Sequence, residues 1–267
     1  MKNFLMLLAV VTAVWCASCS KDDDEPLNVE EGEGVITMVV NVKGNLGNDD
    51  GFVFGIYSFK KSEIITVDWG DGSVEEFRTE SDDNGDDEDE GYSTGYLEGH
   101  SYAKRKSYTI TIKGNVWGVD YEGNDIAPLT SLNVSRCPEL KYLCCPYNNL
   151  TSLDVSKNTA LEHLHCFENN LTSLDVGKNT ALEILGCSDN NLTSLDVSNT
   201  ALIELDCENN KFSASALNKI FTDLPQGKTW GDSEDEQSNI LIENNPGTKT
   251  CDKSIAEKKG WRVYDNR

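Results

Sequence analysis

Leucine, valine, cysteine and asparagine recur at fixed spacings between residues 129 and 211. Four near-copies of one pattern follow one another there: Leu129–Asn149, Leu150–Asn170, Leu171–Asn191 and Leu192–Lys211. The first three copies are 21 residues long and the fourth is 20. A fixed period in this range predicts a solenoid, in which each coil buries its apolar positions only against its neighbours.

Each copy contains the pattern L-x-x-L-x-C-x-x-N-x-L, and its other half reads L-x-x-L-x-V-x-x-N. We expect two short extended segments per coil, with leucine, valine and cysteine facing inward. The asparagines are expected to hydrogen-bond the backbone of the next coil, because buried amides without a helix need such partners. The pattern resembles the leucine-rich-repeat core of a short bacterial subclass, which implies a solenoid of four coils over residues 129–211.

Four cysteines, Cys145, Cys166, Cys187 and Cys207, share one inward position of the repeat. A buried cysteine behaves as a small hydrophobe. Parallel side chains on neighbouring strands have poor torsions for a disulfide, and seven cysteines, an odd number, follow Cys19. We therefore expect these four thiols to be unpaired.

Outward positions differ between the two halves of a coil. On the L-T-S-L-D-V half they hardly vary, which favours a structural role. On the L-x-x-L-x-C half they change from coil to coil, and a varied strand face is the usual recognition surface of a solenoid. The predicted ligand-binding face consists of Tyr142, Cys144, His163, His165, Ile184, Glu204 and Asp206.

Three of these residues, Cys144, His163 and His165, raise the hypothesis of a zinc site, since thiolate and imidazole both bind zinc. A structural zinc takes four ligands, however, and variable surface residues also fall together by chance. We therefore expect neither a metal nor another cofactor.

Residues 212–267 predict a small α/β C-terminal cap. A helix is expected from the N-cap Ser213 to Leu224, with a strand over 239–242, a short helix over 252–259 and a strand over 261–264. The Asn-Pro-Gly and Lys-Gly-Trp spacings of this segment resemble the closure of Bacteroidetes leucine-rich-repeat surface proteins.

Residues 35–116 contain short β-rich runs with turn signals, which predict a β-sandwich. Trp69-Gly70-Asp71-Gly72, with His100-Ser101-Tyr102 and the alternating run 108–112, resembles a PKD-type domain. The resemblance implies an immunoglobulin-like sandwich that acts as a spacer or interaction unit without catalysis. His100 is expected to be a packed residue, and the acidic insertion 80–90 a solvated loop that does not fit a calcium-binding register. Residues 117–128 are interpreted as a junction and N-terminal cap.

The first residues predict a targeting signal. A positive start at Lys2 precedes an apolar run too short to span a membrane. Ala17-Ser18-Cys19 resembles a bacterial lipobox, although Cys16 stands where leucine is usual. The resemblance implies a signal peptide over 1–18 and lipidation of Cys19; a plain secretory signal is the alternative. Residues 19–34 predict a flexible tether, and its Lys-Asp-Asp-Asp-Glu run resembles the surface-export signal of Bacteroidetes lipoproteins, which implies display outside the outer membrane.

The formal net charge of −23 disfavours nucleic-acid partners, and no catalytic motif is present. We expect a mainly β, non-enzymatic lipoprotein that binds a protein or host-surface ligand and meets the membrane only through its lipid. A glycan-binding accessory of a polysaccharide-uptake system is an alternative, against which the strand face offers only Tyr142 as an aromatic platform. A stalk without a ligand is the third.

Overall fold

The computed structural model describes residues 34–43, 54–58, 62–81, 92–97, 100–124, 126–229 and 237–265. The chain divides into Met1–Glu31 and Gly32–Arg267, and all described residues belong to the second unit. The expected signal peptide, the lipidated Cys19, nearly all of the tether and most of the acidic insertion lie outside them.

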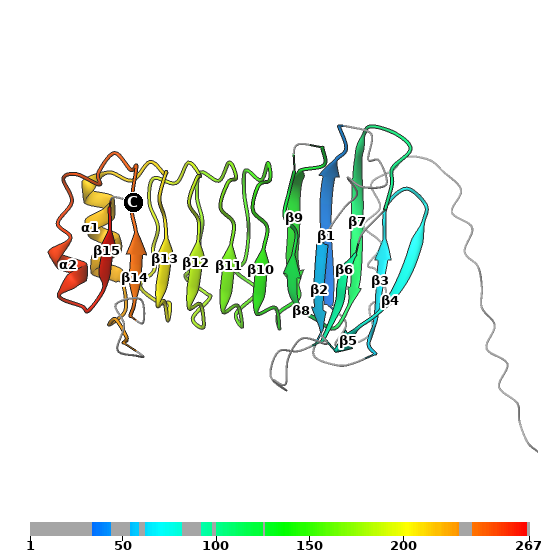
Figure 1. The fold of residues 1–267 in the computed structure, drawn as a ribbon, viewed down its shortest axis with the longest axis horizontal. Helices are drawn as coiled ribbons and strands as arrows, with labels where there is room; N and C mark the ends of the chain where they lie inside the picture. Colours follow the sequence, from blue (N-terminus) through cyan, green and yellow to red (C-terminus); the bar gives the residue numbers. More distant parts are fainter. Residues whose placement is uncertain are drawn as a thin grey trace, which may run out of the picture. The chain divides into compact units, whose positions relative to one another are not determined.

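The described residues form fifteen strands and two helices, so the protein is mainly β as expected (Figure 1). The elements are β1 (Gly34–Asn41), β2 (Phe54–Ser58), β3 (Ile64–Asp68), β4 (Val74–Arg78), β5 (Glu80–Ser81), β6 (Tyr92–Leu97), β7 (Ser107–Gly114), β8 (Val116–Asp120), β9 (Leu129–Arg136), β10 (Tyr142–Cys144), β11 (His163–His165), β12 (Ile184–Gly186), β13 (Glu204–Asp206), α1 (Ala214–Asp223), β14 (Asn239–Leu241), α2 (Ser254–Glu257) and β15 (Arg262–Tyr264).

Five strands form one antiparallel sheet in the order β4-β3-β7-β1-β9. In β7 the side chains of Tyr108, Ile110 and Ile112 are buried and alternate with more exposed residues, as the period of two predicted. Their apolar side chains belong to the same continuous core as the leucines of the solenoid. The N-terminal region and the coils are therefore stabilised together.

The second sheet runs from this region through the whole solenoid, in the order β15-β14-β13-β12-β11-β10-β8-β2-β6-β5. Its strand β8 pairs antiparallel with β2 and parallel with β10. The first sheet is shared as well, because β9, the first half of the first repeat, pairs antiparallel with β1. Of the expected junction, residues 117–120 are thus part of a sheet strand.

His100 is packed, as its sequence context indicated. Its ring stacks on Trp69 with centroids 4.2 Å apart, and its Nε2 lies 3.1 Å from Oδ2 of Asp71. Tyr102 donates a hydrogen bond of 2.8 Å from its hydroxyl to the carbonyl oxygen of Trp69. These contacts fasten the turn after β3 to the segment that leads into β7.

Each coil contributes one three-residue strand to a parallel ladder. Seven strands, β8 and β10 to β15, stand in continuous register. The second expected segment is a sheet strand in the first coil alone, since L-T-S-L-D-V joins no sheet in the later coils. A strand needs a hydrogen-bonding neighbour, which β1 supplies to β9 alone. Beyond it, Asp154 bends the chain by accepting a 2.9 Å hydrogen bond from the amide of Ser156.

Asparagine side chains join successive turns, as the repeat predicted, and the bonds run to the preceding turn. Asn190 accepts a hydrogen bond at Oδ1 from the amide of Leu171 (2.9 Å) and donates from Nδ2 to the carbonyl of Cys166 (3.0 Å). The same position bonds in the same way in the other turns: Asn148, Asn169, Asn210 and Asn245. These five buried amides form the asparagine ladder.

All seven cysteines of the described residues are free thiols. The four that share the inward repeat position are fully buried, and burial raises their pKa well above the usual value. Each therefore stays a protonated, small apolar side chain at neutral pH.

The C-terminal segment is more than a cap, because it adds two coils. Helix α1 is capped at its start by Ser213, whose hydroxyl accepts a hydrogen bond from the amide of Ala216, and its C-cap is Leu224, as predicted. Beyond it, β14 and β15 extend the parallel ladder, and Asn245 adds a rung. No helix among the described residues is long and apolar enough to cross a membrane.

The asparagine ladder predicts a large loss of stability on removal of one rung. Asn190→Ala leaves the amide of Leu171 and the carbonyl of Cys166 without side-chain partners in a buried site, which costs about 3 kcal/mol of unfolding free energy. Urea unfolding followed by circular dichroism measures it. Asn191→Ala is the matched control, because that neighbouring side chain is exposed, and we expect a change below about 0.5 kcal/mol there. Equal losses in the two variants would contradict the ladder's role.

Because the cysteines are free thiols, we expect the protein to have the same thiol count and the same stability with and without reductant. The test uses a chain that begins after Cys19 and is prepared without reductant. Thiol titration of this chain, once denatured, should find seven reactive groups. Dithiothreitol should leave the melting temperature unchanged. A titre of five or fewer would show a disulfide and overturn the packing role given to these cysteines.

Candidate ligand-binding face

The parallel register sorts the outward side chains of the solenoid sheet into two columns. The residues in register with the first position of β10 form one column: Gly118, Tyr142, His163, Ile184, Glu204, Asn239 and Arg262. The residues in register with its third position form the other: Asp120, Cys144, His165, Gly186, Asp206, Leu241 and Tyr264. The middle residue of each strand from β10 to β13 is a buried leucine. We call the two columns over β10–β13 the strand face.

All seven residues expected on the strand face lie in these columns. Glu204 is exposed, and the other six are half-buried against their neighbours. The structure brings Tyr142, His163, Ile184 and Glu204 together along one column and Cys144, His165 and Asp206 along the other. The columns lie on either side of the buried leucines, so the face is two side chains wide.

One aromatic residue that the sequence did not assign to this face extends it. Tyr57 of β2 lies opposite Gly118, with its ring 5.9 Å from the ring of Tyr142 and 5.3 Å from that of Trp117. A Cβ at Gly118 would stand 3.0 Å from the ring of Tyr57. Gly118 thus leaves room for the ring of Tyr57. A glycine at this outward position, next to Tyr142, is the one local sign in the sequence that another side chain packs there.

Imidazole rings continue the aromatic group toward the C-terminus. The rings of His163 and His165 each lie 6.2 Å from the ring of Tyr142. On the next strand, a Cβ at Gly186 would stand 3.0 Å from Nδ1 of His165 and 3.7 Å from the ring of Phe167. The two rings cover this glycine, which is buried. Rings therefore stand on β10 and β11 of the face and on the nearby strand β2, with Gly118 of β8 between them.

Carboxylates replace the rings on β13. Asp206 accepts hydrogen bonds from the hydroxyl of Ser188 at Oδ2 (2.9 Å) and from the amide of Glu208 at Oδ1 (3.2 Å). These bonds hold its carboxylate in one orientation. Glu204 stands beside it in the other column and is exposed. The strand face thus changes from rings to negative charge over two strands.

Burial keeps the thiol and phenol of the face neutral. It raises the pKa of Cys144 to about 12, assisted by the nearby carboxylate of Asp120. Burial likewise raises the pKa of Tyr142 above its usual value. A protonated thiol is neither a nucleophile nor a metal ligand. Cys144 therefore contributes shape and polarity to the face rather than reactivity.

The zinc arrangement considered from the sequence does not form. No group of three or more His, Cys, Asp and Glu in the described part of the chain is placed to hold a metal ion. Cys144 and His165 share one column, whereas His163 lies in the other, across the buried Leu164. The three side chains are adjacent without converging.

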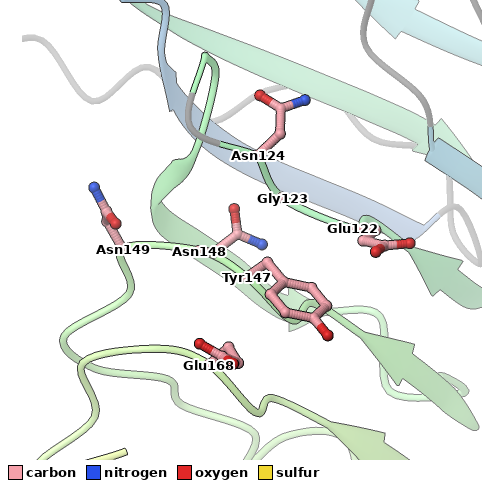
Figure 2. Close-up of a pocket in the computed structure, with 7 residues that line it drawn as sticks. All are labelled: Glu122, Gly123, Asn124, Tyr147, Asn148, Asn149 and Glu168. Carbon is pink, nitrogen blue, oxygen red and sulfur yellow. The ribbon is translucent and has the colours of Figure 1, made fainter. Parts of the chain in front are cut away.

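A surface depression of about 500 Å³ lies at the turns that follow β8, β10 and β11 (Figure 2). It is lined by Glu122, Gly123, Asn124, Tyr147, Asn148, Asn149 and Glu168. Asn148 is a rung of the asparagine ladder, so its side chain is already engaged. Tyr147 connects the depression to the ring group, since its ring lies 5.3 Å from that of Phe167. No sequence pattern indicated this depression, because its lining comes from three different turns.

The neutral imidazole of His165 predicts a pH dependence of stability. Burial lowers the pKa of His165 below 6.5, and the neighbouring His163 lowers it further, whereas Asp120 and Asp206 oppose the shift. The unfolded chain therefore binds the proton more readily, and this residue destabilises the fold as pH falls below about 6.5. We expect the melting temperature of His165→Gln to drop less between pH 7.5 and pH 5.0 than that of the parent. An equal drop would contradict the buried state of this ring.

No family model matches the chain, and no curated protein matches its sequence. Among solved structures, the chain is similar to the functional domain of InlJ from Listeria monocytogenes, which includes a cysteine ladder. The two are 26% identical, the match covers 57% of this chain and 30% of that one, and the TM-score is 0.45. A likeness of this extent shows neither the family nor the function. By its own repeat and strand pairing, the chain forms a leucine-rich-repeat-like β-solenoid.

Proposed function

We propose that the protein is a non-enzymatic cell-surface lipoprotein that binds a protein partner through the strand face. One observation carries the proposal. The outward columns of β10–β13 change chemistry from ring to carboxylate, while the inward and turn positions of the same coils repeat almost unchanged. A solenoid that served only as a scaffold would have no need of such variation on one face.

The anchor is proposed from the sequence alone. Lipidation of Cys19 would tether the chain to the outer membrane, and residues 20–25 carry the lysine and acidic run that resembles a surface-export signal. Both lie outside the described residues. The proposed location is the outer face of the outer membrane, with the lipid as the one membrane contact.

Residues 35–116 are proposed to be a PKD-type, immunoglobulin-like module that carries the solenoid away from the anchor. The stacking of His100 on Trp69 and the hydrogen bond from Tyr102 to Trp69 support this assignment, because the same motif residues carry the sequence resemblance. The shared strand β8 also supports a spacer role, since it joins the module to the coils through backbone hydrogen bonds.

A glycan-binding accessory role is the second candidate, and Tyr57 favours it. From the sequence, Tyr142 is the one aromatic residue expected on the face, which argues against sugar binding. The ring of Tyr57 lies 5.9 Å from that of Tyr142, so Tyr142 has a second aromatic ring beside it. Such rings stack on the apolar faces of sugars as well as on protein side chains.

A crosslinking pull-down from host material, run beside a glycan array, tests the proposal. The parent chain should recover a protein partner, and Tyr142→Ala should lower the yield at least tenfold, because a central aromatic anchor contributes about 2 kcal/mol or more. Lys157→Ala is the control, since that exposed lysine lies on a turn of the other half-coil. Its yield should equal that of the parent.

Three other results would contradict the proposal. Glycan hits that depend on Tyr57 and Tyr142, without a protein partner, would establish the second candidate. A partner recovered equally by the parent and Tyr142→Ala would move binding away from the strand face. A chain that recovers nothing and binds no glycan would be a stalk.

A further inference from the structure

We propose that the strand face takes a polypeptide segment bearing a lysine or arginine, with the cation at β13 and a neighbouring apolar side chain on the rings of β10 and β11. This inference rests on the proposed function and narrows the partner to one chemical class. Its basis is the order in which rings, neutral positions and carboxylates succeed one another across the strands.

The cation end is β13. Glu204 is exposed, and no ion pair among the described residues involves it. Asp206, in the other column of the same strand, is held in place by Ser188 and the amide of Glu208. Two carboxylates on one strand, one oriented and one exposed, form an attractive site for a guanidinium or ammonium group.

The cations that flank the face are engaged elsewhere. Lys141 lies 2.8 Å from Glu162, and Lys228 lies 4.0 Å from Glu183. The guanidinium of Arg262 lies over the ring of Tyr264, 4.8 Å from its centroid. A cation supplied by a partner therefore complements the exposed carboxylate of Glu204, which pairs with none of these three side chains. The net charge of −23 also draws a basic segment in from a distance.

The apolar end is the ring group of β10 and β11. Tyr142 is held from one side by Tyr57 and from the other by His163 and His165. A ring fixed on several sides loses little conformational entropy when a partner side chain covers it. The half-buried state of Tyr142 leaves part of its surface open for that contact.

The distance between the rings and the carboxylates determines how far apart the apolar and basic residues of the ligand must be. Strand β12 contributes no charged or aromatic side chain of its own to the face, because its outward positions are Ile184 and the buried Gly186. Neighbouring strands lie about 4.8 Å apart, so β11 and β13 are separated by about 10 Å. In a polyproline-II segment, residues i and i+3 point the same way and lie about 9 Å apart. A basic residue and an apolar residue at that spacing fit the two ends.

Selection of phage-displayed random dodecapeptides on the immobilised full chain tests the inference, with synthetic copies of the enriched peptides rebound to variants in solution. The enriched peptides should carry Lys or Arg three residues from an aromatic or aliphatic side chain. The double variant Glu204→Gln/Asp206→Asn should weaken binding, raising the dissociation constant at least tenfold. Glu76→Gln, which removes one exposed charge from β4, should leave it unchanged, and 0.5 M NaCl should weaken binding to the parent.

The contrary results separate this inference from the proposed function. Enriched peptides that are neutral or acidic, and that are lost with Tyr142→Ala, would overturn the cationic class while the strand face remained the binding site. Peptides that bind the parent, the double variant and Tyr142→Ala equally would overturn both. The absence of enrichment over an uncoated surface would overturn the basic peptide segment as the ligand.

Discussion

The hydrogen bonds of the asparagine ladder are the constraint on which the solenoid depends. Each coil turns sharply after its short strand, and the turn leaves backbone amides and carbonyls buried with no helix or sheet to pair them. One asparagine side chain per turn, such as Asn169, accepts from an amide and donates to a carbonyl of the preceding turn. Because an unpaired buried amide costs about 1–3 kcal/mol, the side chain at this position has almost no freedom to change.

That constraint explains how the protein divides its residues between structure and recognition. Leucines fill the core, and asparagines close the turns. Cysteines such as Cys187 fill the buried position that follows the short parallel strand of a coil. The outward columns on the ladder strands remain able to vary. Rings gather on β10 and β11, and carboxylates on β13. The same repeat that makes the coils alike therefore leaves one narrow face on which each coil differs.

The sequence predicted the features that depend on local periodicity. It predicted the asparagine and cysteine columns, helix α1 with its cap at Ser213, and the side chains of the strand face. It missed Tyr57, because the pairing of β2 with β8 joins residues far apart in the chain and has no local pattern. For the coil that contains β14, the sequence predicts only a cap. Its I-x-I-x-x-N run, from Ile240 to Asn245, repeats the ladder spacing without the leucines and cysteine that made the preceding coils visible.

Hydroxyl-radical footprinting of the chain, free and saturated with its partner, tests most directly the claim that recognition lies on the strand face. We expect Tyr142, His163 and His165 to lose reactivity in the complex, while strand β4 and the turns around Lys157 react as before. Protection of those turns or of strand β4, with Tyr142 unchanged, would contradict the claim.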